Sequence, residues 1–212
     1  MDLEQIRREY LAGGLRRKNL NSDPFEQFQE WLAQALRSDI PDPTAMTLAT
    51  VDHTGQPSQR IVLLKHSDDR GMVFFTNYES QKGQDIAGNS KVSLHFPWHG
   101  IERQVLIKGS AEKVPQAESE QYFATRPVES QISAWASPQS RELPTRQALL
   151  NRYQEKEIEF DAKAVSLPEF WGGYRVIPDY FEFWQGGAHR LHDRFRYTRV
   201  AGLSWQIARL AP

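Results

Sequence analysis

The 212-residue sequence contains no cysteine. A chain without thiols forms no disulfide framework, no thiolate metal site and no cysteine nucleophile. It also lacks any apolar run near the ~20 residues that a membrane-spanning helix needs, and its charged N-terminus lacks the apolar core of a signal peptide. We therefore expect a cytoplasmic protein without a membrane partner.

Net charge is a second thing that the sequence has little of. Lys and Arg together number 26 and Asp and Glu 27, which leaves a formal charge of -1. Because no excess of positive charge is present, we expect no nucleic-acid partner and favour a small-molecule ligand. Internal repeats and low-complexity tracts are also absent, so residues 1–212 are interpreted as a single domain.

Hydrophobic periodicity predicts a mostly antiparallel β-protein with helical additions. Asp23 followed by Pro24 is typical of a helix start, and apolar residues then recur at helical spacing. Short alternating runs separated by turn residues indicate a meander that closes into a barrel or a strongly curled sheet. The predicted strands cover residues 46–51, 59–65, 72–76, 92–96, 104–111, 174–177, 180–184, 195–199 and 205–210. Further helices are predicted over 81–87, 115–125, 130–136 and 145–162.

The strand R-I-V-L-L-K at residues 60–65 has four consecutive apolar residues between two cations, Arg60 and Lys65. An uninterrupted apolar run predicts burial on both faces of the strand. The cations at its ends are expected to reach either solvent or an anionic ligand, and the sequence leaves these two alternatives open.

Two further stretches have the composition of phosphate sites. Ser80, Gln81 and Lys82 stand where a short helix begins, and unpaired N–H groups together with a lysine can hold a phosphate there. A phenol, a guanidinium and a hydroxyl follow at intervals of four residues, which would share one helical face if helical geometry continued through Pro127. These three residues are Tyr122, Arg126 and Ser130.

The stretch F-E-F-W-Q-G-G-A-H-R-L-H-D-R at residues 181–194 is the densest in chemical groups. An aromatic strand ends at two glycines that permit a turn, and Arg190, His192 and Arg194 follow it. Arginine forks bind carboxylate or phosphate, and histidine can exchange a proton near neutral pH. The alternative is a structural ion-pair cluster at the end of a strand, and composition leaves both readings open.

Two other features have a functional and an ordinary interpretation. Residues 1–20, with a hinge at Gly13-Gly14, fit either a mobile flap over a site or a frayed terminus. The histidine pairs 189/192 and 95/99 lack a helical H-E-x-x-H context, so no metal site is predicted.

Motifs along nearly the whole chain are similar to those of the pyridoxine (pyridoxamine) 5′-phosphate oxidase family. They are R-R-E-Y at 7–10, D-P-T-A-M at 42–46, Q-R-I-V-L-L-K at 59–65, F-F-T-N at 74–77, F-P-W at 96–98, E-R-Q-V at 102–105, F-W-G-G at 170–173 and the stretch 181–194. The resemblance implies an antiparallel FMN-binding split β-barrel with peripheral helices. It also implies a homodimer with two flavin sites at the subunit interface.

The resemblance assigns a role to each matching position. Flavin contacts are expected from Arg60, Ile61, Val62, Leu63, Leu64, Lys65, Phe75, Thr76, Gln81, Lys82, Gln104, Gln139, Ser140, Trp184 and Arg194. Substrate contacts are expected from the flap residues Arg7, Arg8, Glu9 and Tyr10, from the phosphate cup Lys65, Tyr122, Arg126 and Ser130, and from Arg190, Leu191 and His192. Arg190 and His192 are the expected catalytic residues. His189 and Asp193 are expected to have a structural role and no contact with substrate or flavin.

The implied reaction is oxidation of pyridoxamine or pyridoxine 5′-phosphate to pyridoxal 5′-phosphate, by hydride transfer from C4′ to FMN, with O₂ as acceptor and H₂O₂ as product. One departure is Gln81, where the family commonly has arginine. If the lost contact to the FMN phosphate was direct, its absence costs about 1.5 to 3 kcal/mol. Two alternatives are weighed, another split-barrel flavin reductase and a pyridoxal 5′-phosphate binding or delivery protein with a second anion site at Arg16, Arg17 and Arg209.

Overall fold

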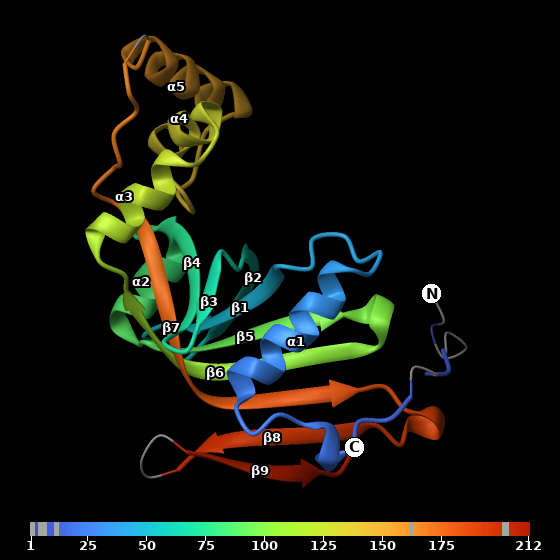
Figure 1. Cartoon of the computed structure of the whole chain (residues 1–212). Helices are drawn as coiled ribbons and strands as arrows, with labels where there is room; N and C mark the ends of the chain where they lie inside the picture. Colours follow the sequence, from blue (N-terminus) through green and yellow to red (C-terminus); the bar gives the residue numbers. More distant parts are fainter. Residues whose placement is uncertain (1–2, 4–7, 11–12, 162, 201–203) are drawn as a thin grey trace.

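The computed structural model describes residues 3, 8–10, 13–161, 163–200 and 204–212. Within them a nine-stranded antiparallel sheet runs in the order β2-β1-β5-β6-β7-β4-β3, with β8 paired to β7 and β9 to β8. The sheet curls until β2 and β4 come into contact, which confirms the predicted barrel-like architecture (Figure 1). The strands are β1 (Ala45–Val51), β2 (Pro57–Leu63), β3 (His66–Asp68), β4 (Gly71–Asn77), β5 (Lys91–Trp98), β6 (Arg103–Lys113), β7 (Trp171–Gln185), β8 (Asp193–Arg199) and β9 (Trp205–Leu210).

Strand β7 joins the two parts of the sheet. Its first half pairs with β4 and its second half with β8, while β6 runs alongside most of it. The sequence predicted two strands here, interrupted near Pro178, and that division is wrong. A register shift after Lys108 places Gly109 opposite Pro178, and a Cβ at Gly109 would lie 2.1 Å from the carbonyl oxygen of Ile177. The glycine lets the bulge form, so the strand continues through the proline.

Burial of the strand 60–65 on both faces was predicted wrongly. Ile61 is 73% exposed and Leu63 41% exposed. The described chain pairs β2 with β1 alone in the sheet, so β2 is an edge strand, and one of its faces remains at the surface of the single chain. The strand also ends at Leu63, and the short strand β3, which was not predicted, follows it.

Helix α1 (Pro24–Leu36) closes one side of the core as the sequence predicts. Its N-cap is Asp23, whose carboxylate accepts a hydrogen bond from the amide of Phe25. The buried face then packs onto the sheet, with the ring of Phe28 5.0 Å from that of Phe96 and the ring of Trp31 5.2 Å from that of Phe183. Burial of such rings contributes about 1.5–3 kcal/mol each, so this contact fixes the sheet that carries the site.

The other helices lie apart from α1, with α3 to α5 rising over the end of the barrel at which β7 begins (Figure 1). Helix α5 has no buried residue, as expected for its charged sequence, and none of the described helices is long and apolar enough to cross a bilayer. The remaining helical segments are η1 (Arg17–Asn19), α2 (Gln81–Gly88), η2 (His99–Ile101), α3 (Gln116–Ala124), α4 (Val128–Ala136), α5 (Arg146–Glu159) and η3 (Ala188–Arg190).

Candidate active site

A cavity of about 460 Å³ lies where β2, β4 and the start of β7 face helices α3 and α4. Its lining contains three cations and, among the described residues, no carboxylate, so we name it the cationic cavity. A cavity with this charge pattern attracts anions. It is lined by Ile61, Val62, Leu63, Lys65, Phe75, Thr76, Lys82, Tyr122, Arg126, Pro127, Ser130, Gln139 and Trp171.

The phosphate cup expected from the four-residue spacing converges here, but not on one continuous helix. Helix α3 ends at Ala124 and α4 begins at Val128, so the chain is broken between Tyr122 and Ser130. The break follows from proline, which disfavours helical geometry in the residue before it. All three cup residues nevertheless line the cavity, because two helices replace the single one assumed.

One wall of the cavity is a set of nearly parallel rings. Phe75 and Tyr122 stack with centroids 3.9 Å apart at 15°, and Trp171 lies 4° from the plane of Tyr122. A planar aromatic surface next to cations suits a ligand that combines a ring with an anion.

Arg126 has a buried polar atom without a partner. Its guanidinium carbon lies 4.7 Å from the ring centroid of Trp171, and its Nη1 is buried with no hydrogen-bond acceptor among the described residues. Burial lowers the pKa of Arg126 below its ordinary value. An unpaired, partly desolvated guanidinium gains free energy from a phosphate, so the residues present fit a phosphorylated ligand.

Lys82 lies on α2 and is 8% exposed. Its Nζ donates to Ser80 Oγ at 3.0 Å and to Gln139 Oε1 at 2.7 Å. Burial and the neighbouring charge of Arg60 lower the pKa of Lys82 to about 8, with partial compensation from Asp85. The ammonium keeps one further N–H for an anion.

A second group of predicted residues crosses three neighbouring strands, and we name it the strand-end cluster. Gln104 on β6 is in register with Trp184 on β7, and Trp184 with Arg194 on β8. The Arg194 guanidinium donates from Nε to Glu182 Oε1 at 2.8 Å. The ring of His192 lies 4.7 Å from that of Trp184.

The described part of the N-terminal segment rests on this cluster. Arg8 donates to Glu102 at 2.8 Å, and Glu9 accepts from the amide of His189 at 2.7 Å. Tyr10 lies edge-on to Trp184, with ring centroids 5.6 Å apart. A Cβ on Gly186 would lie 2.6 Å from Tyr10 Cδ1, so the glycine makes room for the phenol ring.

The turn after Gly186 has an unusual backbone. His189 and Arg190 both have positive φ, 55° and 63°, a left-handed conformation that non-glycine residues seldom adopt. Such strain persists where the surroundings enforce it and is frequent at ligand sites. Arg190 and Leu191 are exposed there.

The cationic cavity and the strand-end cluster occur at opposite ends of β7. Trp171 at its start lines the cavity, and Trp184 near its end belongs to the cluster. Fifteen residues of strand separate these ends, on the order of 45 Å along the chain path. Figure 1 likewise shows helices α3 and α4 and the turn between β7 and β8 on opposite sides of the molecule.

Known families match both parts of the sequence. Residues 32–157 match pyridoxamine 5′-phosphate oxidase, and residues 171–212 match the pyridoxine 5′-phosphate oxidase C-terminal dimerisation region. The chain belongs to the pyridoxamine 5′-phosphate oxidase family. It is 61% identical to a pyridoxine/pyridoxamine 5′-phosphate oxidase of Teredinibacter turnerae and 57% identical to one of Pseudoalteromonas translucida, each over the full length of both chains.

Solved structures of the family show the same fold. PhzG from Burkholderia lata, in complex with tetrahydrophenazine-1-carboxylic acid, superposes with a TM-score of 0.87 at 31% identity, covering 92% of this chain and 95% of the other. An FMN-binding protein of Nostoc punctiforme reaches a TM-score of 0.70 at 13% identity, covering 91% and 100%. The split-barrel fold implied by the sequence motifs is therefore confirmed.

Some family positions lie outside the cationic cavity and the strand-end cluster. The Leu64 side chain is in the hydrophobic core, and Arg60, Gln81 and Ser140 do not line the cavity. Arg7 is outside the described residues. Asp193 accepts hydrogen bonds from the Leu15 amide and from an arginine of β9, which agrees with its structural interpretation.

Of the three residues of the possible second anion site, Arg16, Arg17 and Arg209, one already has partners within the chain. Arg209 pairs with Asp193 and donates to the carbonyl of Leu15, while Arg16 and Arg17 are exposed. Arg209 would have to leave these partners to bind another anion.

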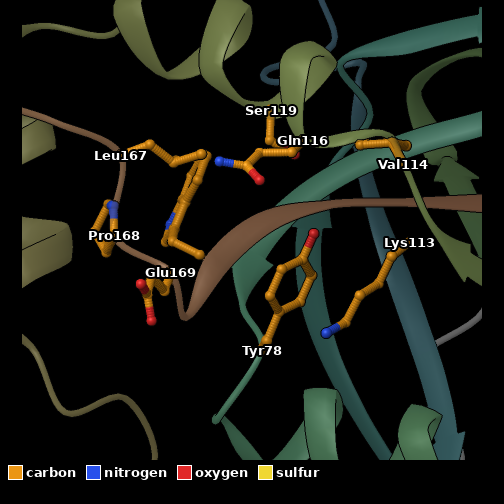
Figure 2. Close-up of a pocket in the computed structure, with 9 residues that line it drawn as sticks. Tyr78, Lys113, Val114, Gln116, Ser119, Leu167, Pro168 and Glu169 are labelled. Carbon is orange, nitrogen blue, oxygen red and sulfur yellow. The ribbon is translucent and has the colours of Figure 1, made fainter.

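Trp171, Thr50 and Asp85 are neighbours of the site that the sequence did not reveal. Trp171 lies in the motif F-W-G-G, in which no site residue was predicted. It also lines a second pocket of about 330 Å³, in which Tyr78 and Lys113 lie next to each other (Figure 2). Trp171 is therefore a wall shared by two cavities.

Proposed function

We propose that this chain is a flavin-dependent oxidase that converts pyridoxamine 5′-phosphate and pyridoxine 5′-phosphate to pyridoxal 5′-phosphate. The observation that carries the proposal is the unpaired Arg126 guanidinium beside a stacked aromatic wall, in a chain whose full-length relatives are oxidases of these substrates. A flavin reductase whose substrate carries no phosphate would have no use for a second, partly buried phosphate site beside that of the cofactor.

The substrate phosphate is held by the cup at Lys65, Tyr122, Arg126 and Ser130, which all line one cavity. Arg126 and Lys65 supply the charge-assisted hydrogen bonds, and the hydroxyls of Tyr122 and Ser130 donate to the remaining phosphate oxygens. Binding free energy from this remote dianion holds the reacting carbon in place, and therefore contributes to turnover as well as to affinity.

FMN is the proposed cofactor, since a second set of anion-binding groups is present: Lys82 lines the cavity, and Arg60 lies close enough to Lys82 for its charge to lower the pKa of that lysine. Thr76 donates to Gln139 at 3.2 Å, so two further polar side chains are placed beside them. Gln104, Trp184 and Arg194 of the strand-end cluster match the remaining flavin positions of the family. When bound, the flavin supplies the hydride acceptor that no side chain can provide, and O₂ restores its oxidised form with release of H₂O₂.

The proposed active unit is a homodimer with its two flavin sites at the subunit interface. One chain holds the two halves of the predicted site at opposite ends of β7, so a second copy must bring its strand-end cluster to the cationic cavity. The match to the family's dimerisation region covers the members of that cluster on β7 and β8 and the turn between them, but not Gln104 on β6. The exposed Ile61 and Leu63 edge beside the cavity is a surface that such a partner would cover.

Arg190 and His192 face the substrate ring in this proposal. The Gly187 amide donates to His192 Nδ1 at 3.2 Å, which places the ring proton of the neutral imidazole on Nε2. His192 therefore presents an N–H donor, and its Nδ1 is not a free base. Tyr10 packs against His192, so residues 8–10 belong to a flap that excludes water from the substrate.

The test is oxidation of pyridoxamine 5′-phosphate in air by the FMN-loaded protein. The readouts are the absorbance of the aldehyde product and the amount of H₂O₂ formed. Pyridoxamine without phosphate and a reduced tricyclic carboxylic acid serve as comparison substrates. Rapid turnover of the phosphorylated amine alone supports the proposal. Preference for the tricyclic acid would contradict the proposal and indicate a different oxidase activity. Binding of pyridoxal 5′-phosphate without turnover of the amine would contradict it and indicate a binding protein.

A further inference from the structure

A hydrogen-bonded chain that links α2, β1 and β2 ends at Arg60. Arg60 on β2 is opposite Leu48 on β1, and Thr50 lies diagonally across on the same face of this antiparallel pair. The Nη1 atom of Arg60 donates to Thr50 Oγ1 at 2.6 Å, with longer contacts to the carbonyls of Ser58 and Leu48 at 3.3 and 3.5 Å.

Only one nitrogen of that guanidinium is engaged in hydrogen bonds within the described structure. Nη2 lies 3.8 Å from Asp85 Oδ2, which is an ion-pair distance and too long for a hydrogen bond. The N–H groups on Nε and Nη2 are therefore available to an anion, and together they form the fork that binds phosphate oxygens in pairs.

The group that accepts the hydrogen bond from Arg60 Nη1 is the hydroxyl of a fully buried threonine. Thr50 is 0% exposed, and its Oγ1 donates to Asp85 Oδ2 at 2.6 Å while it accepts from Arg60. A hydroxyl has a single proton, so donation to Asp85 leaves its lone pairs directed at Arg60. Thr50 thus relays the orientation of a carboxylate on α2 to a guanidinium on β2.

The carboxylate at the far end is itself fixed. Asp85 is 4% exposed, and its other oxygen, Oδ1, accepts from Gln81 Nε2 at 2.8 Å. Gln81 lies one helical turn before Asp85 on α2 and contributes no charge. The cluster therefore has two cations, Arg60 and Lys82, against one buried anion.

We propose that Thr50 is a positioning residue for the cofactor phosphate, acting through Arg60, with Asp85 and Gln81 as the anchor of its hydroxyl. The inference rests on the proposed function, in which Arg60 binds the FMN phosphate. It assigns to a buried core-strand threonine a part in cofactor selection, namely the preference for the phosphorylated flavin over riboflavin.

The test compares Thr50→Val with Thr50→Ser, because valine keeps the shape and loses the hydroxyl while serine keeps the hydroxyl. FMN and riboflavin are titrated into apoprotein, with quenching of flavin fluorescence as the readout. Thr50→Val is expected to raise the FMN Kd about tenfold, a change of ~1.4 kcal/mol, and to alter the riboflavin Kd less than about twofold. Thr50→Ser is expected to restore FMN binding to near the wild-type value.

Other outcomes separate the inference from the proposed function. Equal weakening of FMN and riboflavin, or unchanged FMN affinity in Thr50→Val, overturns the positioning role. A wild-type protein that binds both flavins equally overturns the use of this cluster as a phosphate site. If Thr50→Val does not fold, Gln81→Leu serves as the second variant, because it removes the hydrogen bond to Asp85 from the exposed side of the cluster. Loss of the preference for FMN over riboflavin in Gln81→Leu supports the inference. An unchanged preference overturns it.

Discussion

The half-buried guanidinium of Arg126, whose Nη1 is buried without a partner among the described residues, gives the sharpest single-residue prediction. Arg126→Met keeps much of the side-chain volume and removes the charge. In the free protein the substitution eliminates an unpaired buried donor, worth about 1–3 kcal/mol, and a cation–π contact worth about 0.5–2 kcal/mol. These terms have opposite signs, so the free energy of unfolding is expected to change by less than about 1 kcal/mol or to rise.

Activity should respond very differently. Loss of two charge-assisted hydrogen bonds to the substrate phosphate, at about 1.5 kcal/mol or more each, lowers kcat/KM for pyridoxamine 5′-phosphate at least ~100-fold. Pyridoxamine lacks the phosphate, so its slow oxidation should be unaffected. The assay is steady-state aldehyde formation with FMN saturating, and Arg152→Met on the exposed α5 is the matched control. Equal losses with both substrates would refute the phosphate cup.

Three further predictions concern the rest of the site. The pKa of Lys82 is about 8 in the folded chain and 10.5 is its ordinary value, so the unfolded chain binds more protons between pH 8 and 10.5. Denaturant titration of the apoprotein should therefore show a free energy of unfolding that rises with pH in this range. FMN affinity, measured by fluorescence, should fall over the same range because the ammonium of Lys82 is lost. Arg8→Ala breaks an ion pair between the exposed Arg8 and the buried Glu102 and should raise KM for the substrate up to about fivefold with little change in kcat; a lower kcat at constant KM would argue against a flap contact. Arg190→Leu should reduce kcat/KM with FMN saturating, and near-normal kinetics would remove Arg190 from the mechanism.

The sequence predicted the local elements well because their signals are local. The N-cap at Asp23, the glycine turn at Gly186 and the approximate positions of most strands follow from backbone preferences of single residues. Burial of β2 was predicted wrongly because an apolar run does not show whether its own chain or another molecule buries it. In the single chain β2 is an edge strand, so one of its faces stays exposed.

The site was predictable in composition and unpredictable in arrangement. The spacing of Tyr122, Arg126 and Ser130 indicated that they act together, although the helix break that lets them converge depends on tertiary packing. Thr50 and Asp85 gave no signal, since a threonine in a strand and an aspartate in a helix are ordinary there. Their roles follow from a contact between β1 and α2 that no sequence pattern specifies.

The central claim is that each active site combines the cationic cavity of one subunit with the strand-end cluster of its partner. It is tested by coexpressing Arg126→Met and Arg190→Leu chains with different tags and measuring the oxidase activity of the mixed dimer. Random pairing should restore about one quarter of wild-type activity per total protein, since half of the dimers are mixed and each of these holds one unaltered site. Activity no greater than that of the two variants assayed separately would place both residues in a site built from a single chain and contradict the account.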